Sequence, residues 1–428
     1  MISIGDIISL IEKGKNIRDF YTKMQKKKID KFVLREKAGR HRTHLYEFLA
    51  ELYYDLDILT GPDGPFPVGI LNIKDAARET PDTLLGHLLQ RSEEIKVKEP
   101  RILEALKRRG ANIWNGKTFS LESLTLDLEG NVNKINASIG SYFNMVSSAD
   151  YLEFEAFAAI ESLDANIALD DLPARQKALS LERTPSECLR HGGGVDSAIA
   201  ISTLVVYLRE GRYWLLCEVR SKKVAVHSDL YHVLPSLMFQ PVTGSSEASL
   251  KTEWSITHNI YREYLEELFS VPEVRSIKKE IAPDFFYKQP NLLYLQNLIR
   301  AGTAQLRGIA VAFNLLNHRP EICTLLLIND ESWYTDQKDI FNARSLGLRH
   351  LNINEEFLRI DADEDKTHPE LVTTLPLDHE HWGEIVKPSL MVPPGAAALV
   401  LGAREATSIL RLPEPEWLQK ITVQRSRH

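Results

Sequence analysis

The sequence predicts an α+β protein in which a helical N-terminal domain, residues 1–115, precedes a larger domain of strands and helices, residues 116–428. Three observations support this prediction. Apolar residues recur at helical spacing through the first 60 residues. From about residue 117 onward, segments with alternating or β-branched apolar residues are typical of strands. At 428 residues the chain is also long enough for two or three domains.

The N-terminal part shows helix signals in order along the chain. Apolar residues over 4–11 and over 45–53 fall on one helical face each. The run Thr-Gly-Pro-Asp-Gly-Pro at 60–65 breaks this pattern. Two further helices are predicted over 81–89 and 100–109, and Gly110 ends the second.

The remainder of the chain alternates between strand and helix signals. Alternation or β-branched content predicts the strands, and helical spacing predicts the helices between them. The predicted strands are 119–128, 132–142, 197–208, 213–221, 304–315 and 322–328, and the predicted helices are 150–163, 255–269 and one that opens at 395.

Composition excludes several classes of protein. The chain is 43% hydrophobic and 26% charged, which is typical of a soluble globular protein and not of a disordered or collagen-like one. Three widely spaced cysteines argue against a disulfide framework and fit a reducing cytosol, so a cytoplasmic location is expected. No apolar run approaches the roughly 18 residues of a membrane helix, and the start of the chain lacks the pattern of a signal peptide.

The net charge of −7 conceals a basic N-terminal segment. Residues 1–42 contain twelve Lys and Arg against five Asp and Glu, a net of +7. Basic residues 13–42 are therefore a candidate contact for nucleic acid. A solvated helix face is the favoured interpretation, because no zinc finger or RNP motif accompanies the segment.

Three glutamates on the helix predicted at 255–269 are the most informative feature. Glu263, Glu266 and Glu267 are three and four residues apart, which places them on one helical face. Like charges at this spacing repel, and a divalent cation would relieve that repulsion. Carboxylate oxygens are ligands that suit Mg²⁺ or Mn²⁺.

The segment from Arg262 to Glu267 resembles the second half of the Nudix box, in which Arg-Glu, an apolar residue, any residue and Glu-Glu follow one another. The predicted order of strand, hairpin, Pro-containing loop and box helix is also similar to that family. The resemblance implies a mixed sheet between helices, an α/β/α sandwich, from about residue 185 to the end. It further implies that the three glutamates bind catalytic Mg²⁺ or Mn²⁺ and that Arg262 pairs with an upstream glutamate.

The box departs from the family pattern at two places. Trp254 stands where the upstream glutamate is expected, and Glu253 lies one residue further away. Glu253 would replace that glutamate if the helix began at a shifted position. Phe269 stands in place of the box glycine. Arg220, at the end of the predicted hairpin strand, is a candidate phosphate contact, and with Glu253 it completes the predicted binding residues.

The run His191-Gly192-Gly193-Gly194 leaves three interpretations open. Together with Val195-Asp196-Ser197 it resembles the loop with which ATP pyrophosphatases bind pyrophosphate. It also resembles the oxyanion motif of esterases, although the chain has no Gly-x-Ser-x-Gly elbow. A flexible glycine linker is favoured, because residues 181–190 do not form the buried strand that the pyrophosphatase loop requires.

The resulting functional prediction is a metal-dependent hydrolase of a nucleoside diphosphate linked to another moiety. The alternative is a catalytically inactive module of the same fold that binds a nucleotide-like ligand and acts as a sensor or regulatory protein. The missing box glycine favours this alternative. The expected partners are a nucleotide-derived small molecule and a second copy of the chain in a homodimer, with no membrane.

Overall fold

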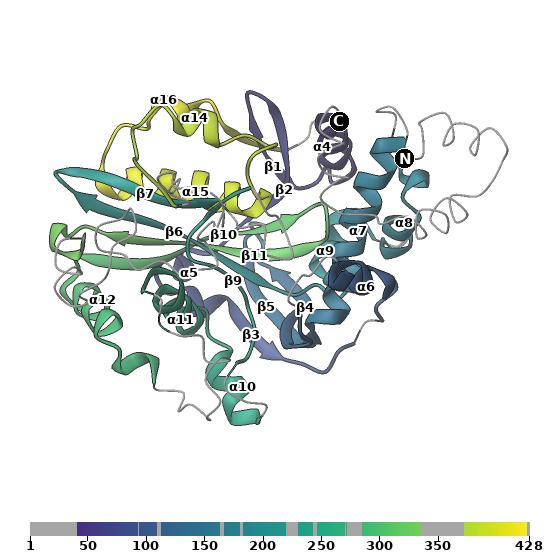
Figure 1. Ribbon diagram of the computed structural model, residues 1–428, viewed down its shortest axis with the longest axis horizontal. Helices are drawn as coiled ribbons and strands as arrows, with labels where there is room; N and C mark the ends of the chain where they lie inside the picture. The colour runs from purple at the N-terminus through teal and green to yellow at the C-terminus, as the bar shows by residue number, and fades with distance from the viewer. Residues whose placement is uncertain are drawn as a thin grey trace.

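The computed structural model describes residues 41–92, 94–108, 113–162, 167–179, 183–219, 230–242, 246–269, 271, 285–334 and 372–425. The α+β class predicted from the sequence is confirmed. A large mixed sheet lies between helix α15 on one face and helices α11 and α12 on the other (Figure 1).

The main sheet is mostly antiparallel. Its central pair, β6 and β11, is parallel, with Ala200 beside Glu321 at one end and Tyr207 beside Ile328 at the other. The short strands β8 (Tyr231–Val233) and β9 (Ser236–Met238) extend it beside β7 and β6. In order across the sheet, the strands are β12 (Val372–Pro376), β7 (Arg212–Val219), β6 (Ala200–Arg209), β11 (Arg319–Ile328), β10 (Ala304–Asn314), β2 (Gly64–Asn72), β1 (Asp57–Gly61) and β13 (Thr422–Arg425).

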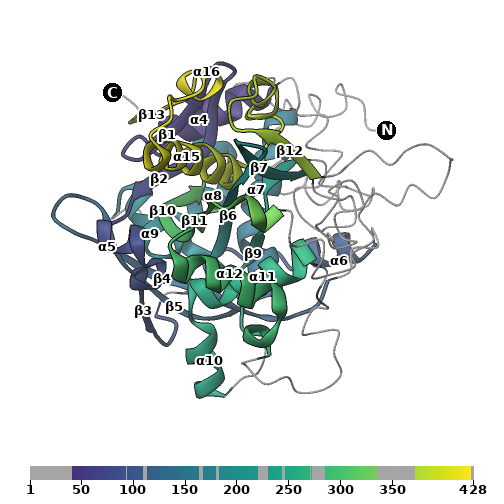
Figure 2. The ribbon, with the colours of Figure 1, turned by 90° about the vertical axis from the view of Figure 1, so that its left-hand side faces the viewer.

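Alternating side chains of the central strands build a core on each face of the sheet. Val205 and Tyr207 of β6 belong to the core beneath α11 (Ile256–Phe269) and α12 (Pro290–Ala301). Leu204 and Val206 belong to the core beneath α15 (Pro393–Leu410). Figure 2 shows α11 beside α12 on one side of the sheet and α15 on the other.

The helical prediction for residues 1–115 is wrong for part of the described segment. Residues 57–61 and 64–72 form the hairpin β1–β2, and β2 pairs with β10 of the main sheet. The Gly-Pro run at 60–65 is the turn of this hairpin and not the end of a helix. The helix predicted at 81–89 is instead a 3₁₀ turn, η2 (Pro81–Leu84), followed by strand β3 (Leu85–Leu88). Helices α4 (Arg42–Leu52) and α6 (Arg101–Arg108) are as predicted.

A second, three-stranded sheet packs below the main one. The predicted hairpin at 119–142 is confirmed as β4 (Lys117–Leu126) and β5 (Val132–Ser141), and β3 pairs with β5 in parallel. Helix α7 (Tyr142–Ser162) follows directly. The remaining α-helices among the described residues are α5 (Asp75–Glu79), α8 (Pro173–Ala178), α9 (Pro185–Arg190), α10 (Glu247–Glu253), α14 (Trp382–Ile385) and α16 (Glu416–Gln419).

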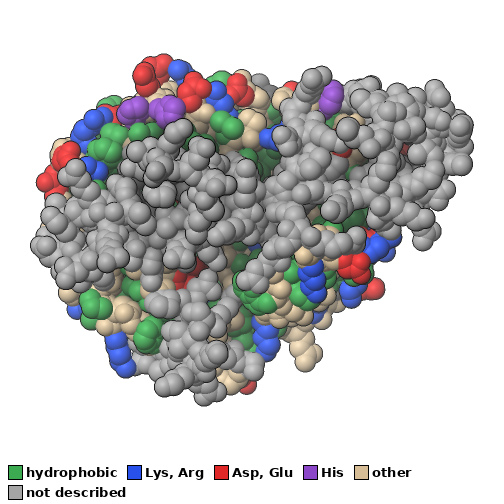
Figure 3. Space-filling model, in the orientation of Figure 1, with side chains coloured by type: hydrophobic (Ala, Val, Ile, Leu, Met, Phe, Trp, Pro, Cys, Tyr) green, Lys and Arg blue, Asp and Glu red, His purple; other side chains and the backbone are tan. Residues whose placement is uncertain are grey.

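The surface of the described residues mixes both signs of charge. Figure 3 shows Lys, Arg, Asp, Glu and His side chains along the rim formed by α14 and α16. Some of these charges pair locally, as Lys387 with Glu384 and Lys420 with Glu416. None of the helices in the described ranges is long and apolar enough to cross a membrane. The three cysteines are buried and form no disulfide.

A buried carboxyl group on α7 predicts a pH dependence of stability. Glu155 accepts hydrogen bonds from the backbone N–H groups of Ala174 (2.7 Å) and Arg175 (3.0 Å) at the start of α8. Burial outweighs these bonds and raises its pKa from 4.5 to about 7. The folded state therefore holds the proton more tightly than the unfolded state. The contribution of protonated Glu155 to the free energy of unfolding is complete below pH 4.5 and is lost as the pH rises to about 7.

Glu155→Gln is expected to remove this dependence, because glutamine stays neutral and keeps an acceptor oxygen. Between pH 4.5 and 7 the wild-type free energy of unfolding should fall by about 3 kcal/mol relative to the variant. Urea unfolding at several pH values measures this difference. Glu104→Gln, on an exposed position of α6, is the control and should leave the profile unchanged. If the free energy of unfolding varied with pH in the same way in wild type and Glu155→Gln, the prediction would be contradicted.

Candidate functional site

The carboxylate helix α11 is separated from α10 by a two-residue junction, Trp254 and Ser255. The Ser255 hydroxyl accepts a hydrogen bond from the backbone N–H of His258 (3.1 Å), as the residue before a helix commonly does. The Asn259 side-chain amide donates to the carbonyl oxygens of Glu253 (2.7 Å) and Ser255 (2.9 Å). These bonds end α10, start α11 at Ile256 and fix the angle between them.

Arg262 lies at the centre of the site and is 1% exposed. Its Nη2 donates a 2.8 Å hydrogen bond to Oε1 of Glu263, and its Nη1 lies 3.8 Å from Oε2 of Glu253. Nη1 also donates to the carbonyl oxygen of Gln240 (3.4 Å). Burial alone would lower the pKa of Arg262, but the neighbouring carboxylates, Glu263 foremost, raise it above its ordinary value. The guanidinium is therefore a fixed positive charge between two acids.

Glu253 reaches Arg262 because the chain turns after α10. Its side chain is completely buried, and Oε2 accepts a 2.5 Å hydrogen bond from the backbone N–H of Val242. The sequence placed this glutamate one residue too far from Arg262 for a continuous helix. The break at Trp254 and Ser255 removes that mismatch, and the structure brings the two side chains together.

The other two glutamates are also nearly buried. Glu266 and Glu267 are each 6% exposed, and Oε2 of Glu267 accepts a hydrogen bond from the backbone N–H of Ser236 on β9 (3.0 Å). This bond attaches the end of α11 to the edge of the main sheet. Nowhere in the described parts of the chain do three or more His, Cys, Asp or Glu side chains form a group able to hold a metal ion.

Two predicted contacts cannot be placed beside these residues. Arg220 lies outside the described residues, and so do residues 13–40 of the basic segment. Their roles toward phosphate and nucleic acid remain predictions.

Phe269, which replaces the box glycine, is part of the hydrophobic core. It is 5% exposed, and its ring centroid lies 4.9 Å from that of Tyr264. The Tyr264 hydroxyl accepts a hydrogen bond from the indole N–H of Trp333 (2.9 Å). The Phe269 side chain thus packs in the core at the last residue of α11, whereas a glycine there would leave the chain free to turn.

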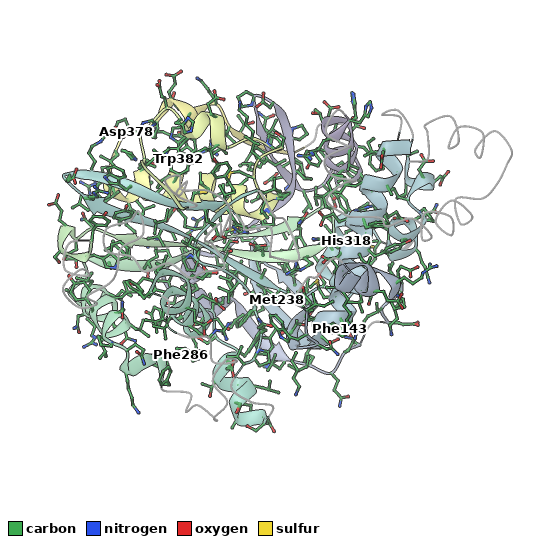
Figure 4. All side chains as sticks on the ribbon, in the orientation of Figure 1. Phe143, Met238, Phe286, His318, Asp378 and Trp382 are labelled. Atoms are coloured by element: carbon green, nitrogen blue, oxygen red, sulfur yellow. The ribbon has the colours of Figure 1, made fainter. Side chains whose placement is uncertain are left out.

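The His191–Gly194 run is not a flexible linker. Gly192, Gly193 and Gly194 are buried, and all three have positive φ. A Cβ on Gly193 would lie 2.8 Å from Nδ1 of His318, and one on Gly194 would lie 2.5 Å from the carbonyl oxygen of Ala178. The glycines are therefore required by a tight buried turn against the β10–β11 turn that carries His318 (Figure 4).

Sequence reasoning missed the polar network around His318. Arg175, fully buried, donates to the carbonyl oxygens of Leu315 and Leu316 (both 2.6 Å) and lies 3.0 Å from both Tyr53 Oη and His318 Nε2. Burial lowers the pKa of His318 to about 3, and the nearby positive charge of Arg175 contributes to this shift. His318 is therefore neutral, and Nδ1 donates to the carbonyl oxygen of Gly193 (3.0 Å). These residues are far apart in sequence, so no spacing pattern could reveal them.

Comparison with known proteins gives little further guidance. No family model matches the chain, and no curated protein matches it. Among solved structures, the chain is similar to a crystal structure of a NUDIX hydrolase from Alicyclobacillus acidocaldarius, with 16% sequence identity and a TM-score of 0.22. The match covers 50% of this chain and 95% of that one. The functional proposal therefore depends on the residues of the site.

Proposed function

We propose that the chain is a divergent Nudix-type, metal-dependent hydrolase of a nucleoside diphosphate linked to another moiety. The proposal includes Mg²⁺ or Mn²⁺ as cofactor, a nucleotide-derived small molecule as ligand, a homodimer and a cytoplasmic location. The observation that supports it most is the buried position of Arg262 between Glu253 and Glu263. The resemblance to the Nudix box implies this pairing of the arginine with an upstream glutamate.

The available carboxylates fit a hard cation with few protein ligands. A site of three protein ligands is lacking among the residues described, and Glu263 already pairs with Arg262. Mg²⁺ commonly uses one or two carboxylates and completes its shell with water and substrate phosphates. Glu266 and Glu267 would supply those carboxylates, and Glu267 also accepts the hydrogen bond from Ser236.

The residues around the proposed metal site would then have distinct roles. A bound metal ion would neutralise phosphate charge and lower the pKa of a bound water. Arg262 holds Glu263 in place and balances the acids around it, and Glu253 fixes the arginine from the other side. Ser236 holds Glu267 at the sheet edge. Glu263 thus acts through Arg262 and orients the site, a narrower role than the metal ligand that the resemblance implies.

The alternative function is a catalytically inactive module that binds a nucleotide-like ligand and acts as a sensor or regulator. Phe269 favours it, because this side chain fills the place of the box glycine and belongs to the core. Such a module would bind a nucleoside diphosphate derivative without turning it over.

Formation of nucleoside monophosphate from a panel of nucleoside diphosphate derivatives with Mg²⁺ or Mn²⁺ tests the proposal. Loss of an outer partner of a metal site commonly costs about 10–100-fold. We therefore expect Glu266→Gln and Glu267→Gln to lower turnover by at least about 100-fold, and Glu263→Gln by about 10-fold. Glu247→Gln, on the exposed side of α10, is the matched control. Turnover unaffected by the first two substitutions would refute the assignment, and tight binding without turnover would favour the inactive module.

A further inference from the structure

A carboxylate outside the Nudix-like part of the chain caps the carboxylate helix. Asp82 lies in η2, and its Oδ1 accepts hydrogen bonds from the backbone N–H groups of Ile256 (2.5 Å) and Thr257 (3.3 Å). The Ser255 hydroxyl donates to the same oxygen (3.1 Å). The first N–H groups of a helix have no partner within it, and a negative charge there also meets the positive end of the helix dipole. Asp82 supplies both a hydrogen-bond acceptor for the first N–H groups of α11 and a negative charge at the start of the helix.

A second bond from the same segment reaches the other side of the junction. The indole N–H of Trp254 donates to the carbonyl oxygen of Gly86 in β3 (3.1 Å). The indole ring stacks on Phe239, with centroids 4.9 Å apart and planes 12° apart. Strand β3 is itself held to β5, because His87 N–H donates to the Asn136 side chain (2.8 Å). Asp82 and Gly86 therefore bond to Ser255 and Trp254, and Gly86 belongs to a strand that is itself paired with β5.

The position of this junction decides where Arg262 and its acids lie. Glu253 precedes the junction and Arg262 follows it, so the 3.8 Å approach between them depends on the angle at which α11 leaves. Asn259 bonds back across the same two residues. A shift at Ser255 would move the arginine relative to Glu253 and, through Glu263, the remaining acids of the helix.

We propose that Asp82 is a positioning residue for the carboxylate helix, so that the segment at 82–86 is part of the functional unit. Its consequence for turnover rests on the proposed hydrolase function. Its effect on the helix does not, because the bonds that support it involve backbone groups of α11. Asparagine can accept the same N–H bonds without the charge, so Asp82→Asn should preserve the position of α11 and Asp82→Ala should not.

Hydrogen exchange of the full-length chain tests the structural part. In Asp82→Ala we expect the amides of 256–258 to exchange about fivefold faster than in wild type, the factor that corresponds to loss of a typical helix cap. Asp82→Asn should remain within about twofold of wild type. Asp75→Ala is the control, since this aspartate lies in the first turn of α5 and is fully exposed. Exchange at 256–258 that is equal in wild type and Asp82→Ala would overturn the proposal.

Kinetics test the positioning role. We expect Asp82→Ala to lower kcat by about tenfold, the usual effect of losing an outer partner of a metal site, with KM for the nucleotide derivative little changed. Asp82→Asn should retain most of kcat. A merely structural cap would lower thermal stability and leave kcat of the folded protein unchanged, which would overturn the positioning role. If the wild type shows no turnover, the hydrolase proposal fails, and the exchange experiment still decides whether Asp82 positions α11.

Discussion

Arg262→Met is expected to lower the free energy of unfolding by about 3–5 kcal/mol, the usual cost of removing one partner of a buried ion pair. Methionine has a similar length and keeps the packing, but it removes the charge between Glu253 and Glu263. Glu253 is completely buried and would then lack the positive charge beside it. Urea unfolding of the full-length chain measures the change.

Two comparisons make this prediction specific to the buried pair. Adding Glu253→Gln to Arg262→Met should recover part of the lost stability, because it removes the carboxylate left without its cation. Lys251→Met breaks the exposed pair with Glu247 and should leave the free energy of unfolding nearly unchanged. A loss below about 1 kcal/mol for Arg262→Met, or no recovery in the double variant, would show that the ion pair does not hold the site together.

Arg175→Met is expected to destabilise the fold by about 3–5 kcal/mol, because several buried acceptors lose their donor at once. The guanidinium donates to the carbonyl oxygens of Leu315 and Leu316, and both residues are buried. The same group contacts Tyr53 and His318, which tie α4 and the Gly192–Gly194 turn to the β10–β11 turn. Its loss should therefore loosen three segments together.

Thermal and urea unfolding measure the effect, and Arg190→Met is the matched control. Arg190 pairs with Glu187 one turn away on α9, at a partly exposed site, so its loss should cost less than about 1 kcal/mol. Similar stabilities for the two variants would mean that water or relaxation of the turn replaces the bonds of Arg175.

The sequence predicts the strands and the carboxylate helix well, because their signals are local. The β6–β7 and β10–β11 pairs carry β-branched runs bounded by turns, and the acids of α11 recur at helical spacing. The N-terminal hairpin was missed because the Gly-Pro run at 60–65 looks the same whether it ends a helix or turns a hairpin. Only the pairing of β2 with β10, far along the chain, decides between them.

The features of the site that the sequence could not predict are contacts between residues that lie far apart in the chain. Asp82 and the bonds at Gly86 lie more than 160 residues from α11. The pairing of Glu253 with Arg262 needs a helix break that spacing rules do not anticipate. The linker prediction for Gly192–Gly194 is wrong, and the partner of this buried turn, His318, lies too far along the chain for a local pattern to indicate it.

Metal dependence of nucleoside monophosphate release is the most direct test of the proposed site on α11. The full-length chain is assayed with a nucleoside diphosphate derivative after chelation and after adding back Mg²⁺ or Mn²⁺, beside Glu267→Gln and the control Glu247→Gln. We predict that chelation abolishes release, that metal restores it in wild type and Glu247→Gln, and that Glu267→Gln stays at least about 100-fold slower. Release that persists without metal, or that Glu267→Gln leaves unchanged, would contradict the assignment of this site.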